Sequence, residues 1–108
     1  MPIHTISSKQ QLDGLLQKYP GLVLLKFGAK WCGPCKTMAP IFQTLSDKHT
    51  DCLFLQVDAD ELPKVMDDYN VSSLPYFAFI KHRKVVSTLV GAVQMSVLDG
   101  AIATQKRK

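Results

Sequence analysis

Apolar positions along the chain alternate between the spacing of helices and the runs typical of strands. Apolar side chains at positions 12, 15, 16 and 19 recur with helical periodicity, and Ser8 with Gln11 predicts a capping box at the start of this helix. After Pro20 and Gly21, the run from Leu22 to Phe27 is almost continuously apolar. Such a run predicts a strand that is covered on both faces.

Further elements follow along the chain. Helical spacing of the apolar residues between Pro34 and Leu45 predicts a second helix, in which Pro34 is tolerated in the first turn and Pro40 bends the middle. An apolar run predicts a strand at Leu53–Val57, and a third helix is expected over residues 62–69.

The last part of the chain predicts a hairpin and a final helix. Tyr76–Ile80 and Val85–Val90 are strand-like runs joined by Lys81–Lys84, and so short a connection requires antiparallel pairing. Helical spacing over residues 97–102 predicts a last helix despite Gly100. Strands that alternate with helices before a closing hairpin indicate an α/β fold with a central mixed sheet and helices on both faces.

Length and charge limit the classes of function. At 108 residues the chain is long enough for one domain, which we assign to residues 1–105, followed by a basic tail at residues 106–108. The formal net charge of +4 comes largely from this tail, and the other basic residues form no stripe interleaved with aromatics. No nucleic-acid partner is therefore expected.

Nothing in the pattern indicates membrane insertion or secretion. The longest apolar stretch, Leu74–Ile80, has seven residues and contains a proline. A spanning helix needs roughly 18. The first residues lack a basic region followed by an apolar core, so no secretory signal is predicted. We expect a cytoplasmic protein with no membrane association.

Cysteine supplies the main chemical signal. Cys32, Cys35 and Cys52 are too few for the disulfide framework of a small secreted domain. Cys32 and Cys35 lie where a buried strand passes into a helix, separated by Gly33 and Pro34. Helix positions three residues apart have Cβ atoms about 5–6 Å apart, and a disulfide requires roughly 3.5–4.5 Å. A small closure therefore joins these two sulfurs, and little rearrangement reopens them.

The two sulfurs are expected to differ in reactivity. Cys32 lies at or before the first helical turn, where free N–H groups and the helix dipole lower the thiol pKa, so it is the candidate nucleophile. Cys35 lies one turn inside the helix, where we expect a more buried, more protonated thiol that resolves a mixed disulfide at Cys32. Gly33 allows close approach of a substrate backbone, Pro34 stiffens the turn, and Trp31 offers an apolar contact for a protein partner.

Two other interpretations of the cysteine pair stay open. A zinc site would need two more ligands, but Cys52 and the three histidines are scattered singly, so no metal is expected. Alternatively, Cys32 and Cys35 are only core residues, which the intervening Gly-Pro disfavours. Cys52 opens an apolar strand, where a plain buried thiol is favoured over a redox role.

The chain closely resembles the thioredoxin family, particularly its eukaryotic cytosolic members, over almost its whole length. The most specific match is Trp31-Cys32-Gly33-Pro34-Cys35-Lys36, and further matches are Ala29, Pro40, Val57-Asp58, Leu74-Pro75 and Gly91. The resemblance implies the thioredoxin fold, a redox-active disulfide between Cys32 and Cys35, a cis bond before Pro75 and a substrate that pairs with the backbone of Leu74. It also implies a docking groove formed by Trp31, Gly33, Pro34, Ser73, Leu74, Pro75, Gly91 and Ala92.

The same resemblance implies a protein-disulfide reductase that serves cell redox homeostasis and electron transport. Such a protein needs no bound cofactor, acts on disulfide-containing proteins, is recycled by thioredoxin reductase drawing on NADPH, and is a monomer. The alternative is a thioredoxin-fold interaction or regulatory module with little turnover, whose cysteines form only a redox-sensitive contact.

Three residues depart from the family pattern. Lys26 stands where thioredoxins carry a buried Asp, so the proton-transfer role of that acid does not carry over. An unpaired buried ammonium is costly, so Lys26 must pair, reach solvent or lose its proton, and one hypothesis is that it modulates the pKa of the cysteines. Gly28 replaces an aromatic residue and removes a packing neighbour of the active-site turn. Tyr76 replaces a Thr, and its bulk is expected to change substrate choice.

Overall fold

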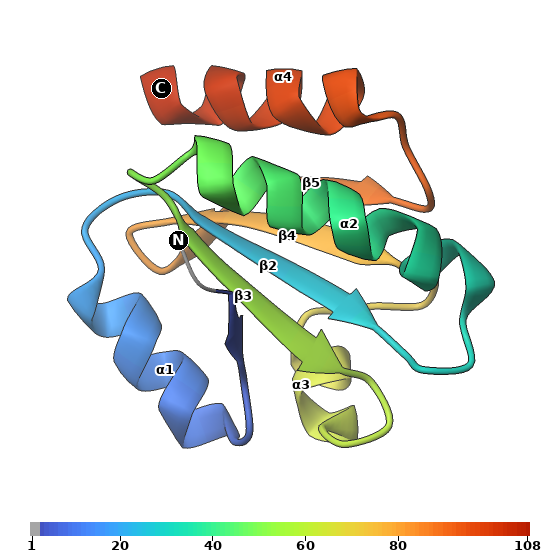
Figure 1. The fold of residues 1–108 in the computed structure, drawn as a ribbon. Helices are drawn as coiled ribbons and strands as arrows, with labels where there is room; N and C mark the ends of the chain where they lie inside the picture. The colour runs from blue at the N-terminus through green and yellow to red at the C-terminus, as the bar shows by residue number, and fades with distance from the viewer. Residues whose placement is uncertain (1–2) are drawn as a thin grey trace.

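The computed structural model describes residues 3–108, which form a mixed sheet with helices on both faces (Figure 1). The predicted α/β architecture is therefore confirmed. Met1 and Pro2, the first residues of the predicted domain, lie outside the described residues. The elements along the chain are β1 (His4–Thr5), α1 (Lys9–Lys18), β2 (Val23–Gly28), α2 (Gly33–Lys48), β3 (Leu53–Asp58), α3 (Pro63–Asp68), β4 (Tyr76–Lys81), β5 (Lys84–Val90) and α4 (Met95–Arg107).

Strand β2 occupies the centre of the sheet, whose strand order is β1-β3-β2-β4-β5. It pairs in parallel with β3 and antiparallel with β4, so that Val23 lies between Leu53 and Ile80. Leu24 and Leu25, on opposite faces of the strand, are both fully buried. The continuous apolar run thus reflects burial on both faces, as predicted.

Helices cover the two faces of the sheet separately. On one face, α1 and α3 pack over a core that includes Leu12 and Val65. On the other face, α2 and α4 pack over a core that includes Phe42 and Ile102. The Phe42 ring lies 5.2 Å from the ring of Phe54, between centroids, inside this second core. The burial of apolar side chains on both faces is the main source of stability.

The start of α1 differs slightly from the predicted capping box. The Ser8 side chain accepts a hydrogen bond from the Gln11 backbone N–H at 3.1 Å, as predicted. The Gln11 carboxamide oxygen, however, accepts from the N–H of Ser7 at 2.7 Å. The reciprocal bond is therefore made one residue earlier than a capping box requires.

Strand β1 was missed by the sequence prediction. His4 and Thr5 pair in parallel with Leu55 and Gln56 of β3, and this pairing forms one edge of the sheet. A strand of two residues has no periodicity to detect, because it exists only through its partner strand.

Strand β5 forms the other edge of the sheet, at the end of the predicted hairpin. The turn between β4 and β5 consists of His82 and Arg83, both with positive φ (51° and 68°). Two such residues are typical of a type I′ turn, here formed without glycine. Along β5, Val85, Val86 and Val90 are about half exposed, and the register of β4 and β5 shifts between Phe79 and Ile80.

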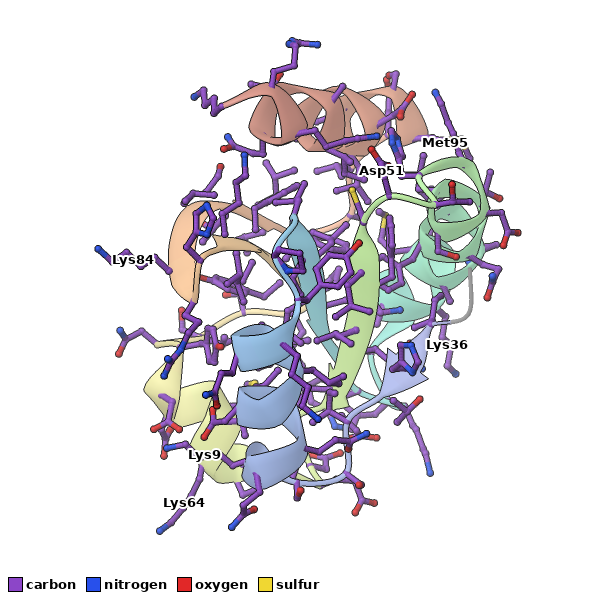
Figure 2. All side chains as sticks on the ribbon, turned by 90° about the vertical axis from the view of Figure 1, so that its left-hand side faces the viewer. Lys9, Lys36, Asp51, Lys64, Lys84 and Met95 are labelled. Atoms are coloured by element: carbon purple, nitrogen blue, oxygen red, sulfur yellow. A yellow bond between two sulfur atoms is a disulfide. The ribbon has the colours of Figure 1, made fainter. Side chains whose placement is uncertain are left out.

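Helix α4 is held by a cluster of charged residues at the end of the sheet where β2 and β3 begin. His49 donates from Nε2 to Asp99 and accepts from Lys106 at Nδ1, at 2.6 and 2.8 Å, and this geometry assigns its neutral tautomer. Lys106 also pairs with Asp51 at 2.8 Å, and Lys48 pairs with Asp99 at 2.6 Å. Figure 2 shows Asp51 just before β3, below α4. We call Lys48, His49, Asp51, Asp99 and Lys106 the α4 cluster.

Two residues of the predicted basic tail belong to helix α4. Helix α4 continues to Arg107, so Lys106 and Arg107 form its last turn. Lys81 of β4 donates to the backbone carbonyl of Gln105 within α4 and to that of Lys108, which follows the helix. The basic residues at positions 106–108 are thus partly used in packing the helix onto the sheet.

No helix in residues 3–108 has the length and apolar character needed to cross a membrane.

Candidate active site

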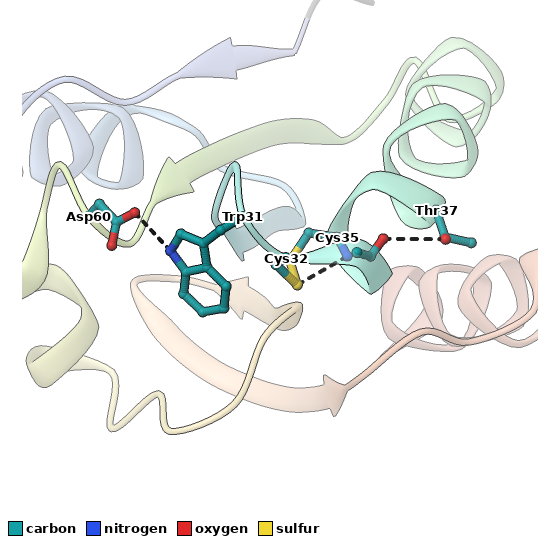
Figure 3. Close-up of a disulfide and its surroundings, with 6 residues drawn as sticks. Trp31, Cys32, Cys35, Thr37 and Asp60 are labelled. Atoms are coloured by element: carbon teal, nitrogen blue, oxygen red, sulfur yellow. Dashed lines mark hydrogen bonds between the residues drawn. A yellow bond between two sulfur atoms is a disulfide. The ribbon is translucent and has the colours of Figure 1, made fainter.

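The two cysteines lie at the junction between β2 and α2. Cys32 is the N-cap of α2, and its Sγ accepts a hydrogen bond from the backbone N–H of Cys35 at 3.2 Å (Figure 3). The two residues form a disulfide with a Cα–Cα distance of 5.2 Å. This is the pair expected from the sequence, placed where unpaired helix N–H groups favour a thiolate at Cys32.

Burial does not distinguish the two sulfurs. Cys32 and Cys35 each expose 6% of their surface, whereas the sequence predicted a more buried Cys35. The difference lies in their surroundings. Cys32 receives the backbone hydrogen bond, and each cysteine lines a different cavity.

The first cavity, which we call the Cys32 groove, measures about 620 Å³. It runs between the active-site turn, the loop after β3, α3 and the segment before β4. Of the predicted groove residues, Trp31, Ser73 and Leu74 line it; Gly33, Pro34, Pro75, Gly91 and Ala92 do not. Its lining consists of Trp31, Cys32, Ala59, Asp60, Pro63, Met66, Asp67, Val71, Ser72, Ser73 and Leu74.

One wall of the Cys32 groove is Trp31. Its side chain is 70% exposed, and its indole N–H donates to Asp60 Oδ2 at 2.9 Å (Figure 3). Sequence reasoning missed Asp60 and Asp67, because no local pattern places the loop after β3 and helix α3 beside the cysteines.

The segment before β4 has the expected backbone. The bond between Leu74 and Pro75 is cis. The Gly91 N–H donates to the Pro75 carbonyl at 2.8 Å, which ties the segment to the end of β5. Gly91 has a φ of +89°, a conformation that side chains disfavour. This hydrogen bond fixes the segment that contains Ser73 and Leu74 relative to the end of β5.

The second cavity, which we call the Cys35 cavity, measures about 320 Å³. It lies on the α2 side of β2 and reaches the ends of β1 and β3. Its lining consists of Thr5, Lys26, Gly28, Ala29, Lys30, Cys35, Lys36, Ala39, Gln56, Val57 and Asp58.

Lys26 is buried next to this cavity. It exposes 7% of its surface, its Nζ lies 4.9 Å from the centroid of the Phe42 ring, and burial lowers its pKa. The aromatic face attracts the ammonium group and compensates part of its lost hydration. Lys26 and Cys35 line the same cavity, an arrangement compatible with the hypothesis that Lys26 modulates the pKa of the cysteines.

The side chain of Tyr76 lies against the core and does not line the Cys32 groove. It is partly buried against the core beneath α1 and α3, with its ring 5.8 Å from that of Phe27. It is absent from the lining of the Cys32 groove. The side chain of Tyr76 thus packs against the core, and its effect on substrate choice stays a prediction.

Cys52 has the environment of a plain buried thiol, as favoured from the sequence. It is fully buried, and burial together with the nearby Asp51 charge raises its pKa to about 11. Such a thiol is protonated at neutral pH and is a poor nucleophile. Within residues 3–108, no group of three or more His, Cys, Asp or Glu side chains is arranged to hold a metal ion.

The fold and the site define a class of protein. A disulfide between residues three apart at the start of a helix, beside an open groove, is typical of dithiol–disulfide redox proteins. The family model described as Thioredoxin matches residues 4–104. The chain belongs to the thioredoxin family, whose members are protein-disulfide oxidoreductases, and the predicted resemblance is confirmed.

Individual relatives agree with this assignment. Thioredoxin H9 of Arabidopsis thaliana is 39% identical over 93 residues, which cover 83% of this chain and 66% of the plant protein. The peptide-N(4)-(N-acetyl-beta-glucosaminyl)asparagine amidase of Caenorhabditis elegans is 33% identical over 101 residues, which are 92% of this chain. The chain spans only 17% of that amidase and less than two thirds of the plant protein.

A solved structure confirms the fold class. The reduced thioredoxin of Schistosoma mansoni matches with a TM-score of 0.90 and 37% identity, over 97% of this chain and 99% of the other.

Proposed function

We propose that this chain reduces disulfides in other proteins by thiol–disulfide exchange at Cys32 and Cys35. The observation that carries this proposal is a disulfide at a helix N-terminus with Cys32 opening onto a groove large enough for a peptide segment. The sulfurs carry the electrons, so the reaction needs no bound cofactor.

The reaction begins from the reduced form of the pair. The Cys32 thiolate, stabilised by the Cys35 N–H and the start of α2, attacks a substrate disulfide and releases one substrate thiolate. Cys35 then attacks the Cys32 sulfur of the mixed disulfide. The second substrate thiol leaves, and the intramolecular disulfide re-forms, so that two electrons have passed to the substrate.

Substrate docking in this proposal uses the surface around the Cys32 groove. Trp31, exposed beside the disulfide, supplies apolar contact, and the backbone of Leu74 pairs with the substrate chain. The remaining members of the proposed docking surface are Gly33, Pro34, Ser73, Pro75, Gly91 and Ala92.

Lys26 has a modulating role in this proposal. Lys26 lines the same cavity as Cys35, and a nearby positive charge favours the thiolate of Cys35 during resolution. Lys26→Met is then expected to move the rising limb of the pH–rate profile to higher pH. An unchanged profile and an unchanged thiol titration would exclude the role.

The cellular setting follows from relatives. The match to an H-type thioredoxin supports recycling by thioredoxin reductase and a cytoplasmic setting, and we propose in addition a monomer that takes part in electron transport. Expected substrates are disulfide-containing proteins.

The proposal is tested by the reduction of insulin disulfides with the purified chain. Wild type is expected to turn over, and Cys32→Ser to show only the background rate. Wild-type turnover no faster than this background would reject the proposal. Cys35→Ser separates an enzyme from a dedicated interaction module: an enzyme accumulates mixed disulfides with many proteins, whereas a module retains one partner even without both cysteines.

A further inference from the structure

The two sulfurs of one disulfide open onto two different cavities. Cys32 lines the Cys32 groove but not the Cys35 cavity, and Cys35 lines the Cys35 cavity but not the groove. The two cysteines of the disulfide therefore border different spaces.

The two spaces carry opposite charge. Among the described residues, the ionisable side chains that line the Cys32 groove, apart from Cys32 itself, are Asp60 and Asp67. The Cys35 cavity contains Lys26, Lys30 and Lys36 against a single carboxylate, Asp58. An anion is accordingly attracted to the space beside Cys35 and repelled from the space beside Cys32.

Gly28 keeps the Cys35 cavity open toward the sulfur. A Cβ atom at this position would lie 3.5 Å from Cys35 Sγ and 3.6 Å from Cys35 Cβ, which is ordinary contact. Any longer side chain would extend along the cavity or against the sulfur. The absence of a side chain at Gly28 thus leaves a small molecule room to reach Cys35.

The identity of the leaving group also favours attack at Cys35. Thiol–disulfide exchange is faster when the departing thiol has the lower pKa. Attack at Cys35 expels Cys32, whose sulfur accepts the Cys35 N–H bond at 3.2 Å and caps α2. Access to the sulfur usually limits this direction of attack, and here the cavity supplies the access.

We propose that the Cys35 cavity is a binding site for a small thiol that carries a carboxylate, and that this thiol opens the disulfide at Cys35. The thiolate forms a bond to Cys35 Sγ, the bond between the two cysteines breaks, and Cys32 leaves as a thiolate. A second thiolate attacks the bound thiol's sulfur, releasing the small disulfide and Cys35. The inference uses the disulfide itself and goes beyond the proposed reduction of proteins.

The site of attack is tested by trapping. The oxidised wild-type protein is mixed with 3-mercaptopropionate and quenched with iodoacetamide, which alkylates the freed cysteine before it reacts back. Trypsin releases residues 31–36, and tandem mass spectrometry locates the two modifications. The proposal expects mercaptopropionate on Cys35 and the alkyl group on Cys32; the reverse arrangement would overturn it.

The role of charge is tested by comparing thiols of opposite charge. Lys26→Met is expected to slow opening of the disulfide by 3-mercaptopropionate about fivefold, as expected for loss of one nearby charge, and to raise the rate with cysteamine, because the ammonium group of that thiol is no longer repelled. Lys18→Met, which removes an exposed lysine of α1 remote from the cavity, is the matched control. An equal effect on both thiols would show an altered disulfide instead of a binding site, and would reject the proposal.

The role of access is tested at Gly28. Gly28→Leu is expected to slow opening by both small thiols, because the side chain fills the path to Cys35. Circular dichroism establishes whether this variant folds, and Lys26→Met gives an independent result if it does not. Rates unaffected by a folded Gly28→Leu would also reject the proposal. Insulin reduction is measured in a separate assay. Failure of the proposed function would appear in that assay, and failure of the present proposal would appear in the rates with small thiols.

Discussion

The two ends of the sheet are built in different ways. At the end where β2 and β3 begin, the α4 cluster joins α4, the end of α2 and the segment before β3 through two ion pairs and the hydrogen bond between His49 and Asp99. At the end where these strands finish, a disulfide lies between two cavities, and the large side chain of Trp31 is 70% exposed. The first end is held together by contacts between distant segments, and the second has open cavities beside its disulfide.

The contacts that stabilise the fold and the residues that react thus lie at opposite ends of the sheet. Hydrogen bonds between charged groups are among the stronger polar contacts, and the α4 cluster concentrates them away from the cysteines. The active-site end has fewer such ties, and the polar groups near the disulfide are largely open to a ligand. Substitutions at the two ends should therefore affect different measurements.

The largest expected effect on stability comes from α4. Ile102 is fully buried, and Ile102→Ala is expected to lower the free energy of unfolding by about 2–5 kcal/mol through lost burial and a residual cavity. Urea unfolding measures this change. The rate of insulin reduction per folded molecule should remain close to that of wild type. A large loss of this rate would contradict the conclusion that the two ends of the sheet serve stability and reactivity separately.

A smaller loss is expected from the α4 cluster. Asp99→Ala removes the acceptor of Lys48 and His49, and we expect a loss of about 1–3 kcal/mol in urea unfolding. Glu61→Ala, which removes an exposed carboxylate, is the matched control and should change stability by less than about 0.5 kcal/mol. Equal effects of the two variants would show that the cluster adds no stability.

The same cluster predicts a dependence on acid. Hydrogen bonds from Lys48 and then His49 lower the pKa of Asp99 from 3.8, and a bond from Lys106 lowers that of Asp51. A lowered carboxyl pKa stabilises the folded state above the unfolded value, and this contribution is lost as the pH falls through the folded value. Urea unfolding between pH 5 and 2 should show a weaker decline for Asp99→Ala than for wild type. Parallel curves would contradict this assignment.

The smallest effect is expected at the active-site end. Asp60→Ala removes the acceptor of the Trp31 indole, but both groups are exposed, so the free energy of unfolding should change by less than about 0.5 kcal/mol. Tryptophan emission should still report the altered surroundings of Trp31, the single tryptophan. A loss of unfolding free energy comparable to that of Asp99→Ala would show that polar contacts stabilise the two ends of the sheet equally.

Local patterns were sufficient for much of the fold. The apolar run of β2, the helical spacing in α1 and α2, and the short connection of the hairpin each specify their own element. Strand β1 could not be found, because its two residues are defined by β3. The turn of His82 and Arg83 was also hidden, since neither residue signals a positive φ as glycine does.

The sequence predicted only those parts of the site whose residues lie close together along the chain. Cys32 and Cys35 are three residues apart, so their pairing followed from helix geometry. The placement of Asp60 beside Trp31 depends on how separate segments of the fold meet, whereas a position of Lys26 near the cysteines was expected from the family resemblance. The contact between His49 and Asp99 joins residues 50 positions apart and had no local signal.

The exposed strand β5 has a consequence for the behaviour of concentrated solutions. An edge strand offers unpaired backbone groups to another chain, and the apolar side chains of Val85, Val86 and Val90 add to the attraction. The positive charge of Lys84 at its start and the irregular register after Phe79 oppose such pairing. Neutralising Lys84 would thus remove one of the features that protect the molecule from aggregation, although this residue lies far from the disulfide in the chain.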